Sequence, residues 1–433
     1  MSVAGVGVVA WGLRVWVIPP GLPSNAELIR IAEEAVPPRW DDVADASPVF
    51  DTVFIQPDRE AGWEDPERRR ADLQRAADRG ARTLVVQYLA HGADSLLSPR
   101  ADGGDEPRDL LDDAARLGLD VWLGTREDPA IWETTEVSLD VWSSAAAGGV
   151  DVARRIAGRY GDHAAFTGWY WTPEAVWAAE PDARRLVRLA RITRRAVRAL
   201  RDAADKPVAV PLGATDLGWT GVYGGAWCRY AEISEADRIV AMDGVGTAHL
   251  DVAHLGRFYG ALRGCAETVG FELVADIEAF GPGIPPAPTR LERQLVAAMG
   301  FAHRRAVFDL GHYLQPGSEG AAFWADPAGP PATIDTAEAD RDDRGARIEV
   351  ARPAARIDVL TQPPHPTSVE LYAILDRGDA QYLGSPLETH GPGRYHRTWL
   401  WRPPEGSEPV REFEVVLRGE KTPGPWEVLA VGD

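Results

Sequence analysis

The sequence predicts an α/β fold: a (β/α)8 TIM barrel followed by a small all-β, sandwich-like C-terminal domain. Three observations predict it. From about residue 50 to residue 315, short apolar runs alternate with amphipathic helix patterns, as stacked βα units do. From about residue 346 onward only strand-like runs follow, separated by turn residues. The 433 residues also suffice for a barrel of roughly 250–300 residues plus a second module.

Eight short apolar runs are the expected barrel strands. They cover residues 51–57, 83–88, 119–124, 166–174, 207–212, 238–243, 271–278 and 306–310. Helix patterns lie between them at about 65–80, 106–117, 141–160, 181–204 and 250–268, with one more after about residue 289. The segment after the fifth run is rich in Gly and Trp, so we expect a loop there. A right-handed series of eight βα units is most simply closed as a barrel.

Composition and hydrophobic pattern divide the chain into four expected parts. They are a lead-in segment at 1–48 with an N-terminal strand at about 5–18, the catalytic barrel at 49–315, a linker at 316–345, and the all-β domain at 346–433. The strand-like runs of the last part cover 347–350, 356–360, 369–375, 395–401, 412–417 and 426–431. The linker is rich in Gly, Pro, Asp and Ala, which favour loops.

The charge of the chain argues against two classes of binding partner, nucleic acids and anionic membranes. The net charge of −20 argues against nucleic acid, whose phosphates demand a basic face. No Lys/Arg-rich run indicates an anionic membrane surface. The N-terminal apolar run is short, lacks a basic flank and is interrupted by Arg14, so it resembles neither a signal peptide nor a membrane span. We expect a cytoplasmic protein, and the Ala-, Arg-, Asp- and Gly-rich composition fits a GC-rich bacterium. The sequence does not indicate an oligomeric state.

The spacing of Cys and His residues favours neither a metal nor a cofactor. Cys228 and Cys265 are 37 residues apart; one bridge is an open alternative, but we expect two free, buried thiols. His249, Asp251 and His254 cluster in sequence, yet the two histidines are five residues apart, a poor alignment for one ion. No nucleophile elbow and no phosphate-binding loop occur. We expect no metal and no cofactor.

Two carboxylic acids are the most informative residues. Glu174 ends the fourth expected strand and Glu278 ends the seventh. The carboxyl ends of the strands of a parallel barrel open onto its active-site face. Two facing carboxylates are the minimum apparatus for cleaving a glycosidic bond. The sequence therefore indicates a reaction class, although it names no substrate.

Further polar and aromatic residues gather at the same strand ends. Side chains alternate along a strand, so Asp276 points the same way as Glu278, and Tyr170 the same way as Glu174. The candidates for substrate binding are Gln56, Gln87, Tyr88, Tyr170, Trp171, Asp243, Asp276, Trp219, His312 and Tyr313. Trp faces pack well on the C–H face of sugars, although core packing remains the alternative for any one of the sixteen Trp residues.

Five short stretches resemble, in order and on the expected strands, an uncharacterised group of TIM-barrel proteins known as a domain of unknown function. They are residues 54–57, 84–88, 168–174, 242–246 and 276–280, and the resemblance covers about residues 50–315. The group is distantly related to a clan of glycoside hydrolases with the acid/base on the fourth strand and the nucleophile on the seventh. The resemblance implies those roles for Glu174 and Glu278. The clan has Asn directly before the fourth-strand Glu, where this chain has Pro173.

The expected function is a glycosidase-like hydrolase acting on a small-molecule or oligosaccharide substrate. Glu174 protonates the leaving oxygen. Glu278 attacks the anomeric carbon at a carboxyl separation of about 5 Å, the retaining course that we favour, or activates water at about 6.5–9.5 Å. Three alternatives stay open. These are an intracellular isomerase, lyase or cyclase using the same acids, a non-catalytic sugar-binding protein, and acids that only form ion pairs.

Overall fold

The computed structural model describes the barrel region and the strands of the C-terminal part. The described residues are 30, 49–57, 65–92, 94–98, 104–131, 138–174, 183–213, 220–247, 250, 255–280, 288–316, 321, 324, 340–341, 345–349, 354–361, 368–374, 380–384, 387–388, 397–401, 412–418 and 426–432. The N-terminal strand expected at 5–18 lies outside them. Within the described residues, no helix combines the length and the apolar character needed to cross a membrane.

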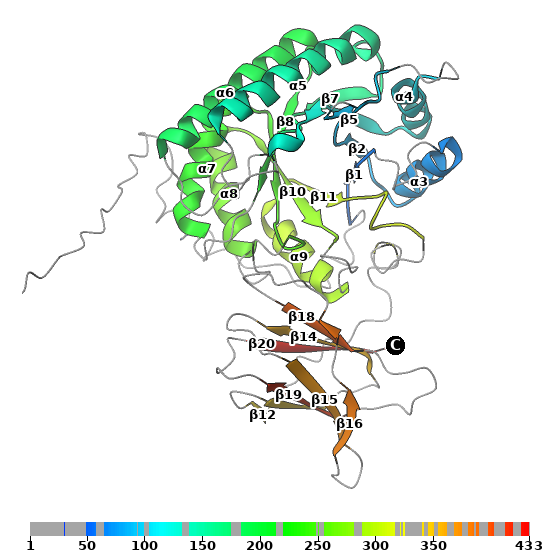
Figure 1. The fold of residues 1–433 in the computed structure, drawn as a ribbon, viewed down its shortest axis with the longest axis vertical. Helices are drawn as coiled ribbons and strands as arrows, with labels where there is room; N and C mark the ends of the chain where they lie inside the picture. Colours follow the sequence, from blue (N-terminus) through cyan, green and yellow to red (C-terminus); the bar gives the residue numbers. More distant parts are fainter. Residues whose placement is uncertain are drawn as a thin grey trace, which may run out of the picture.

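Eight parallel strands close into a barrel, as the sequence predicts (Figure 1). They are β1 (Thr52–Ile55), β2 (Thr83–Val86), β5 (Asp120–Gly124), β7 (Phe166–Tyr170), β8 (Val208–Gly213), β9 (Arg238–Met242), β10 (Glu272–Glu278) and β11 (Arg304–Phe308). Neighbours in the barrel are neighbours in the sequence, and β11 pairs with β1 to close it. In chain order β7 is the fourth strand and β10 the seventh, so the two candidate acids follow the strands on which the sequence placed them.

Helices surround the barrel. They are α3 (Pro66–Asp78), α4 (Glu106–Leu117), α5 (Leu139–Tyr160), α6 (Ala183–Ala203), α7 (Thr220–Ser234), α8 (Leu255–Val269) and α9 (Pro288–Phe301). The Asp65 carboxylate caps α3 by accepting from two backbone N–H groups, as its position predicts. Helix α7 corrects the sequence analysis, which expected a loop there. It carries only Arg229 and Glu232 as charged residues, so it lacks the polar stripe by which a surface helix is recognised.

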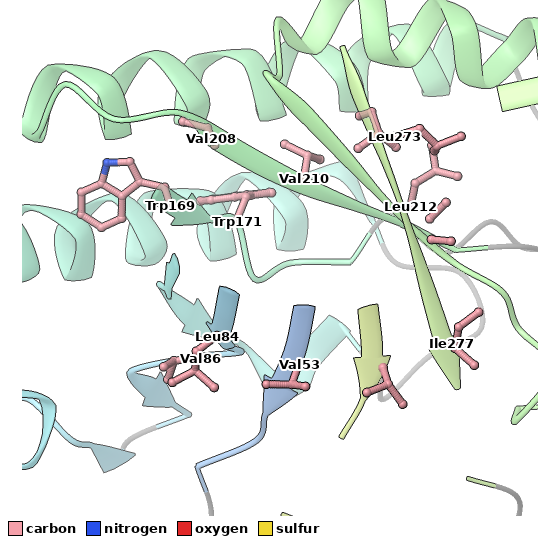
Figure 2. Packing of buried hydrophobic residues seen from close by; sticks show 14 of the residues in the cluster. Val53, Leu84, Val86, Trp169, Trp171, Val208, Val210, Leu212, Leu273 and Ile277 are labelled. Carbon is pink, nitrogen blue, oxygen red and sulfur yellow. The ribbon is translucent and has the colours of Figure 1, made fainter. Parts of the chain in front are cut away.

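Strand alternation divides the apolar side chains into two shells. The inner shell takes one residue from each strand: Phe54, Val85, Trp122, Tyr170, Ala209, Val240, Val274 and Ala306. The neighbouring positions point outward into the layer beneath the helices, where Figure 2 shows Val53, Leu84 and Ile277. The inner shell fills the barrel, so polar chemistry is confined to the strand ends above it.

An ion-paired cluster lies at the amino ends of the strands, opposite the candidate site. Glu272 accepts from Arg238 at 2.8 Å and from Arg304 at 2.6 Å. Both guanidinium groups lie over the ring of Trp122, at 4.5 and 5.8 Å from its centroid. Cationic side chains therefore gather at this end of the barrel.

The C-terminal part forms two antiparallel sheets (Figure 1). One orders β12 (Asp340–Arg341), β13 (Gly345–Glu349), β19 (Glu412–Arg418), β15 (Ser368–Ile374) and β16 (Ala380–Gly384); the other orders β17 (Leu387–Glu388), β18 (Arg397–Trp401), β14 (Ala354–Thr361) and β20 (Trp426–Gly432). Alternate residues of β15 and β19, such as Leu371 and Val415, are buried, which gives their sheet one apolar face. The predicted all-β module is confirmed, with β12, β16 and β17 in addition to the six expected strands.

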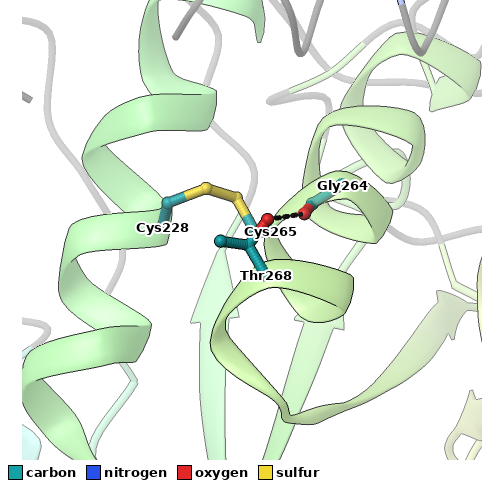
Figure 3. The surroundings of a disulfide bond; sticks show 4 residues. All are labelled: Cys228, Gly264, Cys265 and Thr268. Carbon is teal, nitrogen blue, oxygen red and sulfur yellow. Dashed lines mark hydrogen bonds between the residues drawn. A yellow bond between two sulfur atoms is a disulfide. The ribbon is translucent and has the colours of Figure 1, made fainter. Parts of the chain in front are cut away.

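The two cysteines are paired, which corrects the expectation of free thiols. Cys228 on α7 and Cys265 on α8 form a disulfide, with their Cα atoms 5.2 Å apart (Figure 3). Helices α7 and α8 are neighbours on the barrel surface. The expectation failed because the sequence reading had no α7, and therefore no reason to bring the two thiols together.

Candidate active site

Glu174 lies just beyond the carboxyl end of β7. Gln87, just beyond β2, donates from Nε2 to Glu174 Oε1 at 3.2 Å. Burial raises the pKa of Glu174 to about 8, the charges of Glu127 and Glu278 add to the rise, and the hydrogen bond from Gln87 opposes it. Glu174 is therefore mostly protonated at neutral pH. The influence of Glu278 on this pKa also shows that the two carboxyl groups lie within electrostatic reach of each other.

Glu278, the last residue of β10, is held by the turn that follows β9. Its Oε2 atom accepts from the backbone N of Thr247 at 2.9 Å and from Thr247 Oγ1 at 3.3 Å. The side chain is 6% exposed. Gly246 makes the approach possible, because a Cβ there would lie 2.8 Å from Glu278 Cβ and 2.6 Å from the carbonyl oxygen of Phe280. The carboxylate is thus oriented before any ligand arrives.

Asp243 supports this turn and does not face the barrel mouth. It is 0% exposed, accepts from Val245 N at 3.0 Å, and accepts from Gln294 of α9 at 2.5 Å. The substrate-binding role expected from the sequence stays a prediction. Val240 points inward, so alternation turns Met242 inward and Asp243 outward. Its role is to connect α9 to the turn that carries Thr247.

Asp276 points into the barrel, two residues before Glu278. It is 2% exposed, and its Oδ1 has no hydrogen-bond partner among the described residues. Burial, followed by the charges of Asp243, Glu278, Glu174 and Asp309, raises the pKa of Asp276 well above its usual value. A third carboxyl group therefore lies beside the two candidate catalytic acids, as the sequence predicts.

The two aromatic candidates of the fourth strand, Tyr170 and Trp171, point to opposite faces of the barrel wall. Tyr170 belongs to the inner shell and meets Phe54 edge-on at 5.4 Å, forming the floor below the acids. Trp171 is 1% exposed and lies on the helix side of the barrel, where a Cβ on Gly149 of α5 would meet its ring at 2.9 Å (Figure 2). Trp171 is a core residue, which corrects the expectation that it stacks on sugar.

The eighth strand leads into a polar and aromatic corner. Asp309 is fully buried, and it accepts from the backbone N of Gln56 at 3.0 Å and of His312 at 2.9 Å. Tyr313 stacks on Phe280 at 5.2 Å, and both rings are partly exposed. Three of the predicted residues therefore meet here. Phe280 and Asp309 were not predicted, although Phe280 lies two residues after the seventh expected strand and Asp309 lies within the eighth.

The remaining candidates have mixed outcomes. Tyr88 follows Gln87, is largely buried and lies 5.4 Å from the ring of His91. Trp219 lies outside the described residues. Glu127 on β6 (Arg126–Glu127) was missed; it belongs to a short sheet with β3 (Ala90–His91) and β4 (Asp94–Ser95). Within the described part of the chain, no three His, Cys, Asp or Glu residues are grouped to hold a metal. His249, Asp251 and His254 fall outside that part.

The sequence places the barrel in a known family. A family model described as "Domain of unknown function (DUF4434)" matches residues 51–320. The chain belongs to this family. The match spans the DUF4434 barrel from β1 past β11, and it confirms the family resemblance expected from the five short stretches. No curated protein matches the sequence.

The DUF4434 chain is similar to solved structures. A Bacteroides thetaiotaomicron protein described as a "putative alpha-L-fucosidase" is 16% identical with a TM-score of 0.51, covering 64% of this chain and 91% of that chain. A family 1 β-glucosidase from Thermotoga maritima is 13% identical with a TM-score of 0.38, covering 57% and 77%. At such identities the likeness to the first structure shows a shared fold alone.

Proposed function

We propose that this DUF4434 protein is a glycosidase-like hydrolase, with Glu174 as acid/base and Glu278 as nucleophile or base. The observation that carries the proposal is the contrast between the two acids. Glu174 has a pKa of about 8 and retains its proton at neutral pH, while Thr247 orients the carboxylate of Glu278. A proton donor facing an oriented carboxylate is the apparatus of glycoside hydrolysis. The glycosidase descriptions of the structural neighbours agree with a carbohydrate substrate.

The surroundings of the acids fit a sugar. The partly exposed rings of Phe280 and Tyr313 offer apolar surface to the C–H face of a pyranose. The ring of His312 lies 5.7 Å from that of Tyr313, and Gln56 reaches the same corner through its backbone N, which donates to Asp309. The polar atoms needed for hydroxyl groups and the aromatic faces needed for the ring are thus present at one end of the barrel.

The test is turnover of a broad panel of glycosides and oligosaccharides by wild type, Glu278→Gln and Glu174→Gln. Glu267→Gln is the matched control, because Glu267 is exposed on α8 and pairs only locally with Arg263. We expect cleavage by wild type and the control, and background rates for Glu278→Gln. Full turnover by Glu278→Gln would refute the assignment. Inertness of folded wild type towards the whole panel would instead favour an isomerase, lyase or cyclase, or a sugar-binding protein.

A second experiment distinguishes retention from inversion at the anomeric carbon. If Glu278 is the nucleophile, wild type first releases the anomer that has the configuration of the substrate, as monitored by proton NMR during early turnover. If Glu278 activates water, the first product has the opposite configuration. The retaining course is the one we propose.

The disulfide is relevant to the cellular compartment of the protein. Cysteine pairs persist in oxidising compartments and are rare in the cytosol. Cys228–Cys265 therefore favours an oxidising compartment over the cytoplasm expected from the sequence. Counting free thiols in protein isolated from its source without reductant tests this: two free thiols would restore the cytoplasmic expectation.

A further inference from the structure

Two buried acceptor atoms lie unused beside the candidate catalytic acids. Asp276 Oδ1 and Gln87 Oε1 have no hydrogen-bond partner among the described residues, and their side chains are only 2% and 5% exposed. A buried polar atom without a partner costs roughly 1–3 kcal/mol. A buried polar atom of this kind is satisfied by an ordered water, an ion or a ligand, and its position beside the candidate acids favours a ligand here.

Both acceptors belong to the same site. Gln87 binds Glu174 through its Nε2 atom, which leaves its Oε1 atom beside the same carboxyl group. The charges of Glu174 and Glu278 both act on Asp276, which places it within electrostatic reach of the two acids. Val85 and Val274 face the barrel interior, and alternation turns Gln87 and Asp276 inward as well.

The sequence that follows the barrel strands is poor in positive charge. The stretches after β7, β8, β9, β10 and β11, at residues 171–182, 214–219, 243–254, 279–287 and 309–316, contain neither Lys nor Arg. The stretches after β1, β2 and β5 contain one Arg each: Arg59, Arg100 and Arg126. Arg126 lies 3.5 Å from Asp128. Few cationic side chains therefore follow the strands in the sequence, whereas Glu174, Asp276 and Glu278 lie at the described strand ends.

An ammonium group matches this arrangement better than a hydroxyl group does. It brings three donors and no acceptor, and it carries the charge that neighbouring carboxylates favour. A hydroxyl brings one donor, and an anionic sugar adds like charge beside the carboxylate of Glu278.

We propose that the site takes an amino-bearing glycoside whose ammonium group is held by Asp276 and Gln87. This inference rests on the proposed function, and it names the substrate class of the same site. Asp276 accepts a charge-assisted hydrogen bond, Gln87 accepts a second, and the sugar ring lies between the two catalytic acids. N-acetylation of the ligand removes its charge and two of its hydrogen-bond donors. We therefore expect the acetylated sugar to bind less tightly than the amino sugar.

The experiment measures binding, so that it does not depend on turnover. Dissociation constants are determined calorimetrically for the methyl 2-, 3-, 4- and 6-amino-deoxyglucosides and galactosides, each beside its hydroxyl parent and its N-acetyl derivative. We expect at least one amino member to bind about tenfold or more tightly than both matched ligands, the difference expected for a charge-assisted bond. Weaker or equal binding of every amino member overturns the inference.

Variants assign the effect to these residues. Asp276→Asn leaves no carboxyl group that can ionise to pair with the ammonium group and changes the shape little, so we expect the ratio between hydroxyl and amino dissociation constants to fall to about one. Gln87→Leu should lower the same ratio, and it serves as the test if Asp276→Asn does not fold. Asp151→Asn, at an exposed position on α5, removes an equal charge and should leave the ratio unchanged. An unchanged ratio in both site variants overturns the inference.

The outcomes separate this inference from the proposed function. Preferential amino binding without hydrolysis of any glycoside keeps the inference and refutes the hydrolase. Hydrolysis of hydroxyl glycosides with no amino preference keeps the hydrolase and refutes the inference.

Discussion

Glu174 and Glu278 have the same side chain, and the barrel places them in different surroundings. Glu174 receives one neutral amide donor and lies near the charges of Glu127 and Glu278. Glu278 receives two donors from Thr247 on a single oxygen. Negative charge near a carboxyl group stabilises its protonated form. Hydrogen-bond donors aimed at a carboxylate instead stabilise the ionised form and hold it in one orientation. The proposed division into acid and nucleophile therefore rests on the immediate neighbours of each carboxyl group.

The pKa of Glu174 predicts a pH limit on activity. A general acid works only while protonated, so kcat/KM should decline as pH rises through about 8. We expect Glu174→Gln to lower kcat/KM by a factor of about 10²–10⁴ and to lose this alkaline limb. A pH–rate profile of both proteins provides the measurement. An alkaline limb near pH 8 that survives in Glu174→Gln would assign the titration to another group.

At the scale of elements, the turn after β9 positions Glu278, one of the two proposed catalytic acids. Gln294 of α9 binds Asp243 and also donates to the carbonyl oxygen of Glu278 at 3.4 Å. Asp243 holds the turn through Val245 N, and the turn presents Thr247 to Glu278. Helix α9 and the ends of β9 and β10 thus form one connected support for the carboxylate.

A substitution at Gly246 tests this support. An added methyl group overlaps Glu278 Cβ and the Phe280 carbonyl, so Gly246→Ala should displace the carboxylate. We expect kcat to fall by a factor of about 10² while the far-ultraviolet circular dichroism stays that of wild type. Gly158→Ala on α5 is the control, because no atom lies within 4 Å of its added Cβ. Wild-type kcat in Gly246→Ala would show that the turn does not position Glu278.

The disulfide joins two neighbouring helices and should stabilise the barrel. It closes a loop between positions 37 residues apart, and cross-links of this kind contribute about 2–4 kcal/mol to the free energy of unfolding. The double variant Cys228→Ser, Cys265→Ser should therefore have a lower Tm than wild type. Wild type in reductant should approach the variant, while the variant itself should not respond to reductant. Equal Tm values without reductant would indicate that the thiols are unpaired in solution.

At the scale of the whole molecule, charge is divided between the two ends of the barrel. Arg238 and Arg304 gather at the amino ends of the strands, whereas Glu174, Asp276 and Glu278 lie at the carboxyl ends. The net charge of −20 adds a general negative field. Such a field steers cations towards the acidic end and repels anions.

The division of charge predicts a salt dependence. The affinity for an amino-bearing methyl glycoside should fall as ionic strength rises from about 0.01 to 0.5 M, because salt screens the attraction. The affinity for the hydroxyl parent should change little over the same range. Calorimetric titrations at both ionic strengths measure the difference. An equal response of the two ligands would show that the field does not contribute to selectivity.

The sequence predicts the fold better than it predicts side-chain direction. Its repeating runs correctly place the eight strands, because their spacing is set by local periodicity. The side-chain directions of Trp171 and Asp243 were predicted wrongly because each lies at a strand end. There, a shift of one residue moves a side chain from the barrel interior to the face beneath the helices. Gln294, Thr247 and Glu127 were missed because each reaches the site from a separate segment.

By itself the sequence determined the βα order, the all-β C-terminal module, and the position of acids at the ends of the fourth and seventh strands. These features follow from periodicity and polarity along a short stretch of chain. Only the tertiary structure decided that Glu174 retains its proton, that Thr247 orients Glu278, that the Oδ1 atom of Asp276 is buried without a hydrogen-bond partner, and that Cys228 meets Cys265. Each depends on desolvation or on contact between residues distant in the chain, and these arise only when the barrel closes.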